Sequence, residues 1–144
     1  LFVPVIVFSL GAVTAAKAEQ DNVLYITSSP TNTIEILAEP QSQISLTVSG
    51  KHNGGFKQDW PTLPNFASTL AQPGFLAQTG TGNQIGITVL GNNNPFAVTQ
   101  NGSDSEATGL VLGTGNLALI QQTGNQNTVM FRQLGSDNSL AISQ

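Results

Sequence analysis

Six glycines recur at intervals of eleven residues in the second half of the chain, and no other sequence feature restricts the fold as strongly. They are Gly80, Gly91, Gly102, Gly113, Gly124 and Gly135. An asparagine or serine follows each glycine by three residues, and a glutamine or valine precedes each by two. The unit Q/V-x-G-x-x-N-x-φ-x-φ-x, with φ small or apolar, runs without a gap from residue 78 to 144. Such a register indicates a repeat architecture.

The spacing within the unit is that of β-strands. The asparagine, both φ positions and the closing glutamine or valine differ by two residues, so they share one face of a strand. The predicted strands are Asn83–Val89, Asn94–Gln100, Ser105–Val111, Asn116–Gln122, Asn127–Gln133 and Asn138–Gln144. The glycine between strands permits a tight reversal at positive φ. An antiparallel meander and a coil are both compatible with this unit, and the identical turns favour the coil.

A second period of 22 residues favours the coil further, because glutamine recurs at 78, 100, 122 and 144. Alternate strands then belong to different sheets, and the fold is an all-β, cross-β solenoid with two strands per rung and about three rungs. Like residues would stack in inward columns, where side-chain amides hydrogen-bond along the stack. The predicted inward amide ladder comprises Gln78, Gln100, Gln122, Gln133, Gln144, Asn83, Asn94, Asn116, Asn127 and Asn138.

Three runs, which begin at Gln78, Gln122 and Gln133 and read Q-x-G-x-x-N, resemble the curlin family, the secreted subunits of bacterial curli fibres. The resemblance covers residues 78–144. It implies export through the curli outer-membrane pore and polymerisation at the cell surface in biofilm matrix, with itself or other curlin subunits as partners. Valine at 89 and 111 and serine at 105 depart from the pattern. A major subunit, a nucleator and an accessory repeat protein remain alternatives.

The first half of the chain is less regular. Residues 1–18 are predicted to be a secretory signal peptide whose start lies upstream, because a short apolar stretch ends in the small-x-small site Ala16-Lys17-Ala18. The apolar stretch is shorter than the ~20 residues that a membrane anchor, the alternative, requires. Residues 19–77 are expected to form a cap or an export-targeting segment, with degenerate strands at 22–27, 33–38 and 42–49. The run from Val48 to Asn53 repeats the turn spacing once.

The composition argues against nucleic-acid binding, metal binding and catalysis. Only 8% of residues are charged and the formal net charge is −4, which argues against a nucleic-acid partner. The chain has no cysteine and one histidine, His52, so thiolate and histidine-cluster metal sites are excluded. The acidic residues Asp104 and Asp137 fall on turns of opposite parity and cannot share an ion. No catalytic residue, metal or cofactor is therefore expected, and the protein is not expected to be an enzyme.

These features together predict a secreted structural subunit of an extracellular amyloid-type fibre, and the resemblance to the curlin family implies that the fibre serves biofilm formation and surface adhesion. The expected docking edge for the next subunit is the last strand pair, with Val129, Phe131, Leu140 and Ile142 inward. The alternatives are a fibre-tip adhesin and a monomeric solenoid that binds ice or polysaccharide. A monomeric binder needs a uniform outward ladder, and the expected outward positions lack one. The strand 105–111 has the smallest inward residues, including Gly109, and is predicted to slow assembly.

Overall fold

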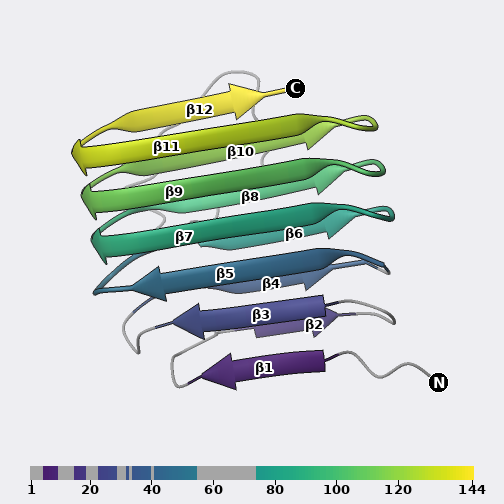
Figure 1. Cartoon of the computed structure of the whole chain (residues 1–144), viewed down its shortest axis with the longest axis horizontal. Coiled ribbons are helices and arrows are strands. Elements are labelled where there is room, and N and C mark those ends of the chain that lie inside the picture. The colour runs from purple at the N-terminus through teal and green to yellow at the C-terminus, as the bar shows by residue number, and fades with distance from the viewer. Residues whose placement is uncertain are drawn as a thin grey trace.

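The computed structural model describes residues 5–9, 15–18, 23–28, 32, 34–39, 41–54 and 74–144. The strands coil into two parallel sheets that face each other (Figure 1). The odd sheet contains β1 (Val5–Ser9), β3 (Val23–Ser28), β5 (Gln43–Ser49), β7 (Gln84–Asn92), β9 (Glu106–Thr114) and β11 (Thr128–Ser136). The even sheet contains β2 (Ala15–Ala18), β4 (Glu35–Ala38), β6 (Phe75–Thr79), β8 (Phe96–Asn101), β10 (Leu117–Thr123) and β12 (Ser139–Ser143). This arrangement confirms the predicted all-β solenoid.

The register also confirms the two-strand rung of 22 residues, which repeats for about three turns between 76 and 143. Gln78 pairs with Gln100 and Gln100 with Gln122, so residues of one period lie directly above one another. The rung that leads from Gln43 to Gln84 is longer. It contains residues 55–73, which lie outside the described part of the chain.

The hydrophobic core lies between the two sheets and follows from the alternation of apolar residues. In β5 the buried and exposed positions alternate strictly, and Ile44, Leu46 and Val48 point inward. Burial of each such side chain stabilises the fold by about 1.5–3 kcal/mol. A second, small apolar cluster lies on the outer side of the even sheet, where Ala97 and Leu119 are buried.

The odd strands run farther than the repeat predicted. The strand expected to end at Val89 continues to Asn92 as β7, and β9 and β11 continue likewise to Thr114 and Ser136. The parallel ladder continues through the glycine itself, since Gly91 pairs with Gly113. The repeat had suggested that the reversal at positive φ ends the strand pairing, but the pairing continues through it.

In the first half of the chain, β3, β4 and β5 lie within one or two residues of the predicted strands. The structure also places β1 and β2 inside the predicted signal peptide, paired with β3 and β4. Cleavage of that segment stays a prediction, as does the role of residues 19–77. No helix in the described ranges is long and apolar enough to cross a membrane.

Candidate assembly interface

The glutamines that recur every 22 residues form one continuous column of hydrogen bonds. Nε2 of Gln78 donates to Oε1 of Gln100 at 2.9 Å, and Nε2 of Gln100 donates to Oε1 of Gln122 at 2.8 Å. Gln122 continues the series to Gln144 at 3.4 Å. Gln78, Gln100 and Gln122 are fully buried. Every amide in the column therefore donates toward the C-terminal end of the solenoid.

The same amide groups also join the two sheets. The second donor on Nε2 reaches a backbone carbonyl of the odd sheet: that of Gln84 for Gln100 and that of Glu106 for Gln122, each at 3.0 Å. Gln78 makes the equivalent contact with the carbonyl of Gln43 at 3.2 Å. A primary amide has two donors, and here one links rungs while the other links sheets. These contacts explain how glutamine is accommodated inside an apolar core.

Gln133 does not join an amide column. The register places it above Val111, and Val111 lies above Val89. Its Nε2 donates to the carbonyl of Leu117 at 2.8 Å, whereas its Oε1 is buried without a hydrogen-bond partner. The last inward residue of each repeat unit alternates between the two sheets. Gln133 belongs to the column of the odd sheet, where the residues below it are valines, and the glutamine column belongs to the even sheet.

The asparagines bind backbone groups more than they bind one another. Oδ1 of Asn94 accepts from the backbone N–H of Asn116 at 2.9 Å, and Nδ2 of Asn94 donates to the carbonyl of Gly113 at 3.0 Å. Asn83 makes the same pair of contacts with the backbone of Ser105 and Gly102 in the rung above. The expected amide–amide stacking therefore needs correction. Each asparagine mainly fastens the turn of its own rung to the turn of the next.

Further asparagines extend or end these columns. Asn53, in the weak motif of the first half, is fully buried, and its Oδ1 accepts from the backbone N–H and Nδ2 of Asn94. At the other end, Asn138 donates from its backbone N–H and Nδ2 to Oδ1 of Asn116 at 3.1 and 2.9 Å. The motif at Val48–Asn53 is thus one more turn of the solenoid.

Glycine is required in the turns by close stacking as well as by φ. A Cβ placed on Gly80 would collide with the carbonyl oxygen of Gly102, and one on Gly102 would collide with that of Gly124. The other edge behaves alike, with Gly91 beneath Gly113 and Gly113 beneath Gly135. These glycines have φ between 96° and 140°, where L-residues are strained. In each of these turns the carbonyl oxygen of the upper glycine therefore lies against the Cα of the glycine in the turn below.

One turn position was missed by the sequence interpretation. The second residue after each repeat glycine is left-handed in every turn: Gly82, Asn93, Asp104, Gly115, Gln126 and Asp137. The signal was the preference for glycine, asparagine and aspartate at that position, the residues that tolerate positive φ. The carboxylates of Asp104 and Asp137 lie over Gly82 and Gly115 of the preceding rung. Both acids therefore serve as turn residues, and no cluster of three metal-ligating side chains occurs in the described residues.

Gly109 also has a role that the sequence did not indicate. A Cβ on Gly109 would collide with the ring of Phe131, which lies in register directly above it. The small residue therefore makes room for a large one in the next rung, and valine at 109 would be obstructed. Whether the strand 105–111 slows assembly stays a prediction.

The longer odd strands also add outward positions. Leu90, Leu112 and Leu134 pair in register and form an outward leucine column. This column was not among the expected outward positions, because the predicted strands stopped one residue before it.

In the last described rung, the groups that join rungs elsewhere have no rung above them among the described residues. β11 and β12 are the terminal strands of their sheets among the described residues. Nδ2 of Asn127 donates to the carbonyl of Thr123 at 3.0 Å, within its own turn, where interior asparagines reach a glycine of the rung above. Of the predicted docking residues, Val129 is buried, and Phe131, Leu140 and Ile142 are half-buried. Open strand edges of this kind are templates for pairing with another chain.

A comparison with known families supports the resemblance. Residues 113–144 match the curlin associated repeat, so the match covers β10, β11 and β12 with their glutamines and asparagines. No curated protein and no solved structure matches the chain.

Proposed function

We propose that this chain is a structural subunit of an extracellular, curli-like amyloid fibre, in which rungs of successive subunits stack on the edges of β11 and β12. The curlin associated repeat and the β-solenoid fold support this proposal. The family is structural, consistent with a protein that is not an enzyme. Secretion, biofilm adhesion and passage through a curli secretion pore belong to the proposal, as does the cap or targeting role of residues 19–77.

One observation carries the proposal: the hydrogen bonds that join one rung to the next recur along the interior turns, in the glutamine column and at the asparagines. The donor column of glutamine, the asparagine contacts to backbone and the glycine stacking all repeat every 22 residues. A rung from another subunit that carries the same glutamine, glycine and asparagine unit could add to β11 and β12 through contacts of this kind. The strand spacing of about 4.8 Å would then continue across the junction.

The test is a pair of matched double variants at the docking edge. Val129→Lys with Leu140→Lys places charges on the inward face of β11 and β12, where the next rung would need apolar contact. Thr128→Lys with Ser139→Lys adds the same charges to the exposed neighbours. The variants are added as monomers to wild-type fibre seeds, and elongation is followed by thioflavin fluorescence.

We expect the inward variant to fail to extend the seeds and the outward variant to extend them at close to the wild-type rate. Circular dichroism of each monomer checks that both still form β-structure. Equal elongation by the two variants would show that growth does not use this edge. A wild-type chain that never forms thioflavin-positive fibres would refute the proposed function itself.

A further inference from the structure

Four columns of outward residues, which precede the turn glycines, run along the odd sheet of the solenoid, and Asn92, Thr114 and Ser136 follow those glycines. Column one contains Gln43, Gln84, Glu106 and Thr128; column two, Ser45, Gly86, Thr108 and Met130; column three, Thr47, Thr88, Leu110 and Arg132; and column four, Ser49, Leu90, Leu112 and Leu134. Columns one and four lie at opposite ends of the strands. The proposed stacking along the solenoid axis does not use this face.

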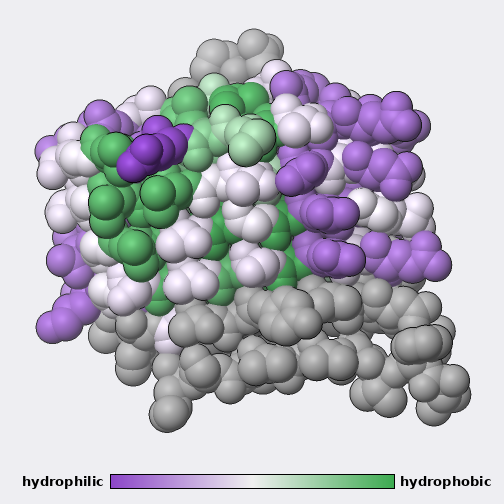
Figure 2. Space-filling view, viewed as in Figure 1, coloured by the Kyte–Doolittle hydropathy of each residue, from purple (hydrophilic) through white to green (hydrophobic). Residues whose placement is uncertain are grey.

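The end of this face near column four is apolar and exposed. Leu112 and Leu134 are 43% and 48% exposed, and Met130 in column two is 78% exposed. Figure 2 shows a hydrophobic area over the ends of β7, β9 and β11, while the opposite end of the same strands is hydrophilic. A contiguous apolar area of this kind marks an interaction site.

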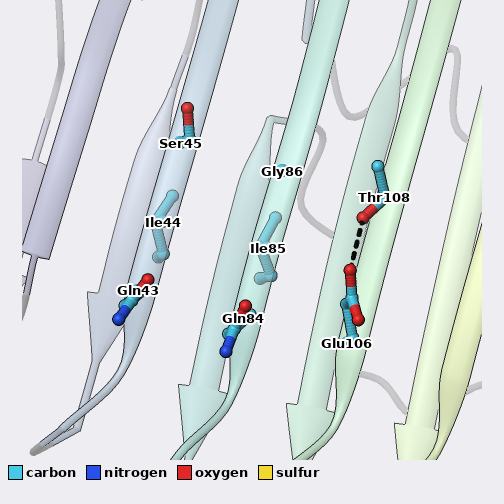
Figure 3. A pocket seen from close by; sticks show the side chains of 8 residues that line it. All are labelled: Gln43, Ile44, Ser45, Gln84, Ile85, Gly86, Glu106 and Thr108. Atoms are coloured by element: carbon cyan, nitrogen blue, oxygen red, sulfur yellow. Dashed lines mark hydrogen bonds between the residues drawn. The ribbon is translucent and has the colours of Figure 1, made fainter.

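The other end of the face contains a shallow hollow of about 160 Å³. Figure 3 shows Gln43, Gln84 and Glu106 in one row beside it, with Gly86 in the middle of the next row. The hollow exists because Gly86 has no side chain, and the nearest atom to a Cβ there would be Oγ1 of Thr108, at 4.0 Å. A small side chain from outside fits over Gly86 without displacing backbone.

Two opposite charges lie on this face without an ion pair in the described residues. Arg132 in column three is exposed and has no salt-bridge partner there, and Glu106 in column one accepts only the hydroxyl of Thr108, at 3.1 Å. The face therefore holds one free cation near the leucines and one available carboxylate near the hollow.

We propose that this face pairs with the same face of a second copy, about a two-fold axis parallel to the solenoid axis. That axis sets column one against column four and column two against column three, with strands antiparallel across the interface. Thr88 of each copy then faces the hollow over Gly86 of the other. Arg132 lies one rung above Glu106 of the second copy and one column away, within reach of a long guanidinium side chain.

A second copy fits this face because the face is complementary to itself. The small residue at 86 and the larger one at 88 exchange places under the two-fold axis, and so do the cationic and anionic ends. Leu90, Leu112 and Leu134 of column four lie opposite Gln84, Glu106 and Thr128 of the second copy and cover the aliphatic parts of these side chains. Paired sheets of this kind interdigitate at about 10 Å.

The test uses charge reversal in the full chain. Arg132→Glu and Glu106→Arg each set like charges opposite one another at both contacts of the two-fold pair, whereas an equal mixture of the two variants restores two opposite pairs. The formal net charge is −6 for Arg132→Glu and −2 for Glu106→Arg, against −4 for the wild type, so the mixture has no general attraction. Sedimentation of the soluble chain measures pairing whether or not fibres form, which separates this proposal from axial stacking.

We expect each single variant to raise the dimer Kd at least about tenfold and the mixture to recover most of the wild-type affinity. Leu134→Ser should also weaken pairing, while Leu37→Ser, at 36% exposure on the even sheet, should not. A mixture that behaves as the sum of its two components overturns the proposal. So does a wild-type chain that stays monomeric in sedimentation and forms only single, unpaired filaments.

Discussion

The turn built from β4 and β5 and the three turns above it share one backbone register but differ in side-chain chemistry. Where the upper turns have glutamine, the lower turn has Ala38, which pairs with Gln78. The next residue of the lower turn, Glu39, accepts with its carboxylate from the backbone N–H of Gly80 at 2.8 Å. Both regions nevertheless bury an unbroken series of apolar side chains between the sheets.

The difference separates two requirements of the fold. Apolar alternation and parallel pairing are sufficient to join β4 to β5 in a rung, since that step has them without the Q-x-G-x-x-N unit, which appears only after β5, at Val48–Asn53. The glutamine, glycine and asparagine of the upper turns specify how one turn sits on the next, through close carbonyl contacts and buried amides. The repeat unit therefore encodes stacking specificity in addition to the strand itself, and the following variants test this distinction.

The largest effect is expected at the stacked glycines. Gly102→Ala introduces a Cβ against the carbonyl of Gly124 at φ 140°, and should destabilise the protein by more than about 3 kcal/mol. Gly124→Ala has strain at φ 102° but no carbonyl above it, so only about 1–3 kcal/mol is expected. Denaturant unfolding gives the free energy of unfolding of each variant, and the difference between the two losses measures the cost of the contact with the carbonyl of Gly124. Equal losses would mean that φ alone selects glycine.

The next effect concerns the glutamine column. Gln122→Ala removes the acceptor of Gln100 and two donors, and should cost about 1–3 kcal/mol through the buried groups left unpaired. Gln84 is exposed on the outer face, and Gln84→Ala should change stability by less than about 0.5 kcal/mol. Thermal unfolding of both variants provides the comparison. Equal losses of stability in Gln122→Ala and Gln84→Ala would show that the glutamine column does not stabilise the fold.

A glutamine at position 38 would give the lower turn the side-chain amide that the upper turns have. Oε1 of Gln78 is buried without a hydrogen-bond partner, and the residue beneath it is Ala38. Ala38→Gln should supply a donor and extend the column by one rung, with a gain of about 1 kcal/mol. Ala38→Leu adds similar volume without a donor and should instead destabilise by about 1–3 kcal/mol. A gain from leucine as large as that from glutamine would point to a cavity and not to the amide.

The smallest effect is expected at the left-handed turn position. Gln126 has φ 59°, while Gly82 and Gly115 hold the equivalent place in other turns. Gln126→Gly relieves strain but increases the entropy of the unfolded chain, so a net gain of about 0.5 kcal/mol is expected. Asp137→Gly at φ 57° should behave similarly. The unfolding midpoints of both variants are measured beside that of the wild type. A lower midpoint for both variants would contradict the prediction.

Much of the upper region could be predicted because the repeat fixes it. The 22-residue period, the two sheets and the inward glutamines follow from spacing alone. The role of asparagine could not be predicted, because spacing does not tell whether an amide binds another side chain or the backbone of the next turn. Asn53 was visible only as a weak motif, since residues 55–73 interrupt the period before Asn94.

Two further features escaped prediction for physical reasons. β6, β8 and β10 lack strict alternation, because Ala77, Ala97 and Leu119 are buried on the outer side of the even sheet while their neighbours are buried on the inner side. The leucine column lies beyond the position where a turn was expected, and the stacked glycines let pairing continue past that point. In both cases contacts with neighbouring strands decide the outcome, and a single strand's sequence does not contain them.

The direction of the glutamine column gives the solenoid an electrical polarity. Each side-chain amide points its N–H toward the rung above, so the amide dipoles add along the axis as peptide dipoles do along a helix. The column begins at the side-chain carbonyl oxygen of Gln78, which is buried above Ala38, and its last hydrogen bond runs from Nε2 of Gln122 to Oε1 of Gln144. The two ends of an assembly of such chains are therefore chemically different surfaces. Subunits would add to them at different rates, and reversing a subunit would set donor against donor.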